Sequence, residues 1–84
     1  MIYPTIHLGG TARADLLAQH LVAMLAVAAA IEALRLACPN GRDYYPQGAD
    51  YINAAMDAHG KRLDALQAIL ADLEALAMHI SDAP

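Results

Sequence analysis

The sequence predicts an all-α protein with one domain, residues 1–84. We expect a long antiparallel two-helix hairpin with a short extended N-terminal arm, closing into a bundle as a homo-oligomer. Twenty of the 84 residues are alanine, which has the highest helix propensity, and 12 are leucine. Two long apolar repeats at helical spacing flank one stretch of turn-forming residues, 38–48. Alanine buries little area, so a second copy is expected to cover the apolar surface that one hairpin leaves exposed.

The first helix is expected at residues 12–37. Thr11 is a favourable N-cap, and Pro39 cannot continue a helix. Apolar residues recur at spacings of four and three along one face, at Leu17, Leu21, Met24, Ala28 and Ile31, and this face is widened by Leu16, Leu25, Val27 and Leu34. The opposite side carries alanines in place of charges, so this helix is apolar nearly all round. One partner helix cannot cover such a surface, which is the main reason to expect self-association.

The second helix is expected at residues 49–80, where the pattern is more regular. A 3.5-residue repeat, typical of a coiled-coil seam, runs through Ile52, Met56, His59, Leu63, Leu66, Leu70, Leu73, Ala77 and Ile80. His59 falls on this seam, where a hydrogen-bonded core histidine would fix the register of the two helices. A polar column away from the seam is formed by Asp50, Asp57 and Asp64.

Charge and composition exclude several classes of function. The net charge of −4 argues against a nucleic-acid-binding protein, which needs a basic patch for phosphates. The single cysteine, Cys38, excludes an internal disulfide, and we expect a packed thiol in a cytoplasmic protein. The apolar run 21–31 is shorter than the ~20 residues that span a bilayer, and no secretory signal is visible, so no membrane is expected as a partner.

Neither catalysis nor a cofactor is expected. No serine lies near a histidine, and no glycine-rich loop is followed by a lysine. The four histidines are His7, His20, His59 and His79. None is three or four residues from another, the spacing at which one helix supplies two metal ligands, so we predict no metal site. A metal bound between His7 and His79 is a minor alternative.

The first candidate binding element is the end of the N-terminal arm, residues 1–10. Two glycines before a helix let backbone N–H groups approach an anion, and the helix start adds partial positive charge. Gly10 and Thr11 are the expected contacts, with His7 nearby and Arg13 adding a full charge. The alternative is a plain glycine turn followed by a threonine cap.

The second candidate is the loop at residues 38–48. Arg42 can pair with a phosphate or carboxylate, Tyr44 and Tyr45 offer flat rings, and Gln47 can contact a polar edge. The alternative is that the tyrosines plug the end of the bundle while Arg42 pairs with Asp43. The loop is longer than a plain connection between helices needs, which favours a binding loop.

The two elements lie at opposite ends of one hairpin, about 40 Å apart for a helix of this length. They therefore cannot form one site within one chain. In an antiparallel dimer, the loop of one copy lies beside the arm of the other, and the two would meet at both ends.

The pairing of PTIHLGGT at residues 4–11 with GRDYYPQG at residues 41–48 resembles a family of small phage and prophage proteins. The resemblance covers most of the chain. It departs from the family pattern at Gly9, usually asparagine, and at Ala49, often proline. The first departure puts in doubt a side-chain contact at that position and leaves the backbone contacts possible. The family's setting is similar to that of phage anti-defence proteins, among them helical sponges that bind nucleotide signals.

This resemblance implies a phage-encoded, non-catalytic protein of the host cytoplasm that sequesters a nucleotide-like anion to counter host immunity. The alternative is a protein–protein interaction module. Such a protein would be an anti-defence inhibitor or a phage structural or assembly factor, acting through its helical surface. The aspartate column of the second helix or the apolar side of the first would then be the working surface.

Overall fold

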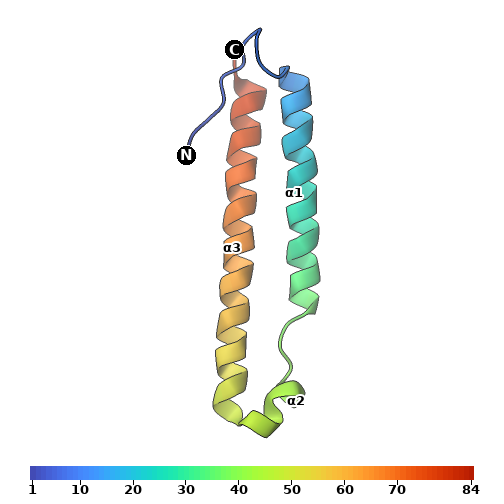
Figure 1. Ribbon diagram of the computed structural model, residues 1–84, viewed down its shortest axis with the longest axis vertical. Coiled ribbons are helices and arrows are strands. Elements are labelled where there is room, and N and C mark those ends of the chain that lie inside the picture. The colour runs from blue at the N-terminus through green and yellow to red at the C-terminus, as the bar shows by residue number, and fades with distance from the viewer.

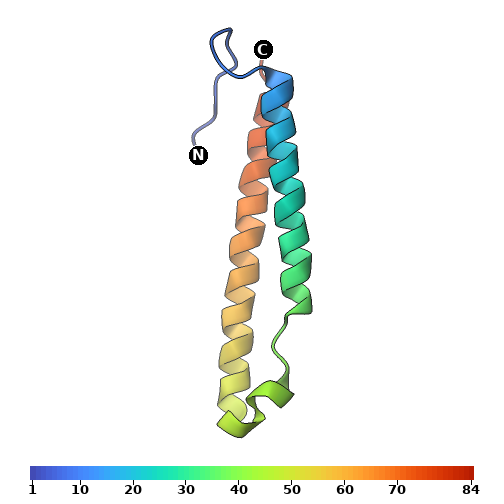
Figure 2. The same cartoon turned by 45° about the vertical axis from the view of Figure 1, so that its right-hand side comes forward.

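The computed structural model describes the whole chain, residues 1–84, as an all-helical protein without strands. Two long helices, α1 (Arg13–Leu36) and α3 (Ala49–Asp82), run antiparallel along a molecule of 61 × 20 × 17 Å (Figure 1). A short helix α2 (Gly41–Tyr44) and a 3₁₀ helix η1 (Tyr45–Gln47) connect them. Figure 2 shows the long helices adjacent from a second direction as well. The expected all-α fold class is confirmed.

The start of α1 differs from expectation in its cap. The helix begins at Arg13, so Ala12 holds the N-cap position, and no side chain accepts a hydrogen bond from the first turn. The expectation that Thr11 caps the helix is wrong, because Thr11 lies one residue too early. The helix ends at Leu36, three residues before Pro39. Proline cannot continue the helix, because it lacks the backbone N–H.

The packing face of α3 follows the expected seam almost throughout. Ala77, Ile80 and His59 are buried, and the leucines of the seam are half-buried. Met56 is the exception and is exposed. Gly48 precedes the helix with a φ of 105°, a backbone conformation that glycine adopts without steric cost. The helix continues to Asp82, two residues beyond the expected end at Ile80.

The packing face of α1 agrees with the expected one only in part. Ile31 is buried as expected, and Leu16, Leu17, Met24, Val27 and Leu34 are half-buried. Leu21, Leu25 and Ala28 are exposed, and Arg13, His20 and Ala23 are half-buried in their place. Because α1 is apolar nearly all round, the hydrophobic pattern does not specify which side faces α3.

A single chain buries very little of its surface. Only four of 84 residues are buried, although 58% of the residues are hydrophobic. The accessible surface is 6038 Å². A compact folded monomer of this mass exposes about 4,800 Å². One chain therefore exposes roughly 1,200 Å² more surface than a compact monomer of its mass.

Helix α1 is the most apolar element and the least buried of the two long helices. By length and composition alone, its 24 residues are sufficient to cross a membrane. The core helix of a soluble protein and a signal sequence pass the same test, so these two properties do not decide its surroundings. Within one chain, Ile31 is its only buried residue.

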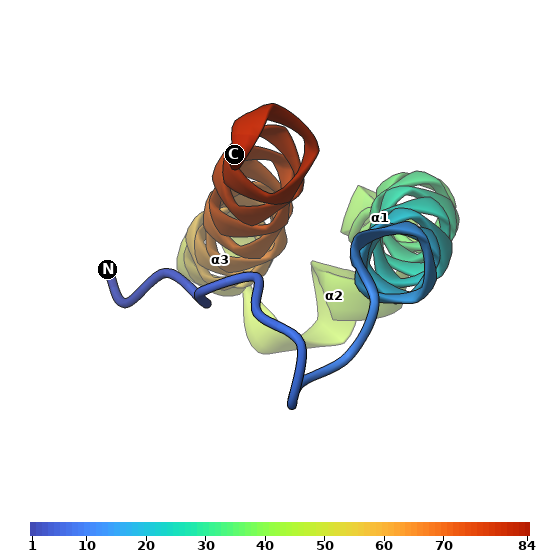
Figure 3. The same cartoon turned by 90° about the horizontal axis from the view of Figure 1, so that it is seen from above.

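Residues 1–12 pass across the end of the hairpin at which the chain also finishes (Figure 3). The ring of Tyr3 stacks on the imidazole of His79, with ring centres 4.6 Å apart. His79 Nε2 donates a hydrogen bond to the carbonyl oxygen of Pro4, 3.1 Å away. The guanidinium of Arg13 donates to the carbonyl oxygen of Ala83. These three contacts attach the start of the chain to the last turn of α3.

Candidate functional site

The loop between the long helices is ordered by an asparagine cap. Asn40 Oδ1 accepts hydrogen bonds from the backbone N–H of Arg42, at 2.9 Å, and from its Nε, at 3.2 Å. Asn40 is the N-cap residue at the start of helix α2, and its hydrogen bond with Nε of Arg42 holds the guanidinium near the loop backbone. The sequence contains the signal for it, since asparagine is a favoured N-cap residue and follows directly on Pro39. Sequence reasoning treated Asn40 as a turn residue and missed this role.

The terminal nitrogens of Arg42 have no partner in the protein. The two salt bridges in the chain join Arg35 to Glu32 and Lys61 to Asp57. Arg42 therefore makes no ion pair with Asp43, so this part of the alternative interpretation of the loop is wrong for one chain. A guanidinium with free N–H groups at an exposed position is available to bind an anion.

The tyrosines line an open hollow of about 410 Å³ at the loop end. Its walls come from Gly41, Tyr44, Tyr45, Gly48, Ala49 and Ile52. Tyr44 is half-buried, which fits a residue that closes the end of the hairpin. Tyr45 is 85% exposed, so it does not act as a plug in one chain. Arg42 and Gln47 are exposed residues of the same loop but do not line the hollow.

The N-terminal candidate residues form a tight turn that differs from the expected anion cradle. The backbone N–H of Gly10 donates to the carbonyl oxygen of His7, 3.1 Å away, and so is not free for a ligand. The imidazole of His7 lies against Gly10, where an added Cβ would be 3.0 Å from Nε2. A larger residue at this position would require the His7 ring to shift by a few tenths of an ångström. Thr11 is exposed and caps nothing.

Arg13 does not face this turn as a free cation. Its guanidinium donates to Ala83, and its Nε is buried without a hydrogen-bond partner. The expectation that Arg13 adds positive charge at this end of the chain stays a prediction, but a contact across 70 residues of sequence holds its guanidinium at Ala83. A second open hollow, of about 420 Å³, is lined by Ile6, His7, Leu8, Gly10 and Ala12.

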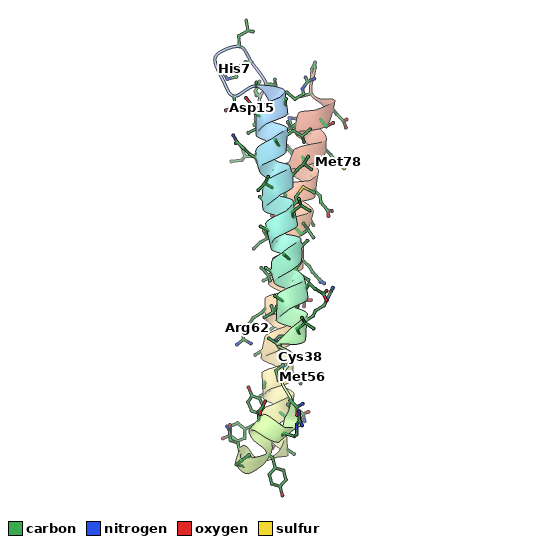
Figure 4. The ribbon with its side chains drawn as sticks, turned by 90° about the vertical axis from the view of Figure 1, so that its right-hand side faces the viewer. His7, Asp15, Cys38, Met56, Arg62 and Met78 are labelled. Atoms are coloured by element: carbon green, nitrogen blue, oxygen red, sulfur yellow. The ribbon has the colours of Figure 1, made fainter.

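The structure keeps the two groups of candidate residues apart. His7, Gly10 and Thr11 lie at the end where the chain begins, and Arg42, Tyr44, Tyr45 and Gln47 lie at the other end (Figures 1 and 4). Figure 4 shows His7 far from Cys38, the first residue of the loop, and from Met56 of α3. One chain therefore holds the two groups of candidate residues at opposite ends of the hairpin.

The histidines do not assemble a metal site in the structure. His79 contacts Tyr3 and Pro4 rather than His7, and no group of three or more histidine, cysteine or acidic side chains lies close enough to hold a metal ion.

His59 is buried as expected, at 5% exposure, but its Nε2 has no hydrogen-bond partner. The expected packed thiol is wrong for one chain, because Cys38 is exposed, with its Sγ 3.7 Å from Met56 Sδ.

Comparison with protein families, with curated proteins and with solved structures finds no match to this chain. The case for a function therefore rests on the residues and their geometry.

Proposed function

We propose that this protein is a non-catalytic binder of a nucleotide-like anion, acting as a homo-oligomer. In this proposal it is a phage-encoded protein of the host cytoplasm that sequesters a nucleotide signal and so counters host immunity. The observation that carries the proposal is the guanidinium of Arg42, whose terminal nitrogens are free and which Asn40 holds in the same loop as the two tyrosines of an open hollow.

The loop supplies two kinds of contact that a nucleotide needs. The free N–H groups of Arg42 match the oxygens of a phosphate, and a bidentate pair also fixes its orientation. The exposed ring of Tyr45 offers a flat face to a base. Stacking of a base on an aromatic side chain contributes about 1–3 kcal/mol and tolerates any base. The loop thus favours a class of ligand without specifying one base.

The N-terminal arm supplies the remaining polar groups in this proposal. The imidazole of His7 lines the second hollow, and the hydroxyl of Thr11 is exposed at the same end. Gly10 contributes the open backbone that allows His7 to lie close, rather than a free N–H donor. Because these residues are distant from the loop within one chain, the complete site needs the arm of a second copy.

Calorimetry with cyclic dinucleotides, cyclic trinucleotides and ADP-ribose derivatives tests the proposal directly. We expect one class to bind in the micromolar range or tighter, and Arg42→Ala to weaken its binding about 10- to 150-fold. This range corresponds to a hydrogen-bonded charged contact of about 1.5–3 kcal/mol.

Arg62→Ala is the matched control, since Arg62 is another exposed arginine, on α3 and outside the loop. The Arg62→Ala protein should bind the compound with the same affinity as the unmodified protein. If no compound of the panel binds in the micromolar range, or if both arginine variants bind as tightly as the unmodified protein, the proposed function is wrong.

A further inference from the structure

The outward side of α1, the side away from α3, carries no charged residue over its central part, residues 16–31. Val22 is 67% exposed and Leu25 is 73% exposed, and small side chains surround them. At 100° per residue these positions share one stripe with neighbours at spacings of three and four. The stripe, called the α1 outer face below, comprises Ala14, Ala18, Leu21, Val22, Leu25, Ala29 and Leu36, and the exposed charged residues Asp15 and Glu32 lie at its two ends.

The outward side of α3 is chemically different. It carries the exposed aspartates Asp50, Asp57 and Asp64 at intervals of seven residues, with Lys61 paired to Asp57. Charged side chains in these positions are ordinary solvated surface. The hairpin therefore has one hydrated outer side and one apolar outer side, and only the latter lacks a suitable neighbour.

We propose that a second copy of this chain packs antiparallel on the α1 outer face, so that the arm of each copy lies beside the loop of the other. This inference deepens the proposed function and rests on its homo-oligomer, but not on the identity of the ligand.

The excess surface of one chain is about as large as the surface that one copy buries in a stable dimer. One chain exposes roughly 1,200 Å² more than a compact monomer of its mass. Obligate dimers bury about 2,000–5,000 Å² in total, which is at least ~1,000 Å² on each copy. The excess surface of one chain thus matches what each copy contributes to such an interface. The alanines of the α1 outer face allow two helix backbones to approach closely while Leu25 and Val22 fill the space between them.

An open groove widens the apolar surface toward α3. Its apolar lining comes from Leu17, Leu21, Met24, Ala77 and Met78, with Glu74 and Ser81 at its edge. Leu21 belongs both to this groove and to the α1 outer face. A second copy seated on the outer face therefore also covers part of the exposed seam between the two long helices.

An antiparallel orientation brings the arm of one copy to the loop of the other, because α1 connects the arm to the loop. A twofold axis through the middle of the helix, near Met24 and Leu25, sets its first turn against the last turn of the second copy. Residues 11–12 of one copy then lie beside residues 37–38 of the other, and the arm and loop continue from these points. Antiparallel neighbours also place opposite ends of the helix macrodipoles together, which is favourable. A parallel dimer would keep each arm away from both loops.

Disulfide trapping tests the surface and its orientation without any ligand. Single cysteines are introduced into a Cys38→Ser background, which holds no other cysteine. After oxidation, Val22→Cys or Leu25→Cys is expected to form covalent dimers as the main product. Ala14→Cys and Leu36→Cys are expected to form few dimers alone and many when mixed. Asp64→Cys, on the outward side of α3, is the matched control and should remain monomeric.

Three results would overturn the proposal. Efficient self-linking of Ala14→Cys would show a parallel dimer, and linking at Asp64→Cys equal to that at Leu25→Cys would show another surface. Flotation of the unlinked protein with phospholipid vesicles, with no linking at any position, would show that a bilayer covers α1. A trapped dimer that binds no compound of the nucleotide panel would instead contradict the proposed function and leave this surface standing.

Discussion

Leu25→Glu is expected to convert the proposed dimer into a monomer, since it places a charge in the middle of the α1 outer face. Burial of a leucine side chain contributes about 1.5–3 kcal/mol, and the axis brings two copies of this residue into the interface. The loss of about 3–6 kcal/mol corresponds to a 10²- to 10⁴-fold weaker association. Two carboxylates close to the same axis would add repulsion and a desolvation cost.

Light scattering at micromolar concentration measures this effect. The unmodified protein should have twice the 8.9 kDa mass of one chain, and Leu25→Glu should have the mass of one chain. Ala68→Glu adds the same charge to an exposed position of α3 and should leave the dimer intact. Circular dichroism verifies that the variant remains helical, and Leu25→Ser is a milder second variant if it does not. A fully dimeric, helical Leu25→Glu protein would contradict the proposed interface.

Ile80→Ala is expected to have the largest effect on the stability of the fold. Ile80 is 0% exposed and is the largest fully buried side chain of the protein. Truncation of a buried isoleucine to alanine lowers the free energy of unfolding by about 2–5 kcal/mol. A core of this size rarely supplies more than about 3–5 kcal/mol, so much of the stability would be lost. At about 4–8 °C per kcal/mol, the thermal midpoint should fall by at least about 10 °C.

Thermal unfolding followed by circular dichroism gives this midpoint, at one fixed protein concentration because the oligomer contributes to it. Ile2→Ala is the matched control, because it removes the same atoms from a side chain that is 94% exposed. Its midpoint should be unchanged. Equal midpoints for the two variants would show that the end of α3 does not pack on α1 as described.

The sequence predicts α3 better than it predicts the packing of α1, for a physical reason. In α3 the apolar residues occupy one narrow seam and charges occupy the far side, so only one face can be buried. In α1, Leu21 and Leu25 are as apolar as Leu16 and Val27, and the pattern does not distinguish the two sides. The choice depends on how α3 lies against α1, which no local repeat encodes.

The candidate sites show the same division between local and long-range information. The asparagine cap that orders Arg42 is local, and the order Pro39-Asn40-Gly41 contains its signal. The contacts of Arg13 with Ala83 and of His79 with Pro4 join residues 70 or more positions apart in the sequence. Their partners are main-chain carbonyl groups, which every residue has. Residue identity therefore could not predict these contacts.

Mixing two weakened variants tests most directly the claim that arm and loop of different copies form one site. His7→Ala removes the imidazole of the arm, and Arg42→Ala removes the guanidinium of the loop. Neither protein alone should have any site that binds the nucleotide identified by calorimetry with the affinity of the unmodified protein. After co-refolding at equal amounts, half of the dimers hold one copy of each, and each of these has one intact site. Calorimetry should therefore recover about a quarter of the sites of the unmodified protein. No recovery in mixed dimers that light scattering verifies would contradict the shared site.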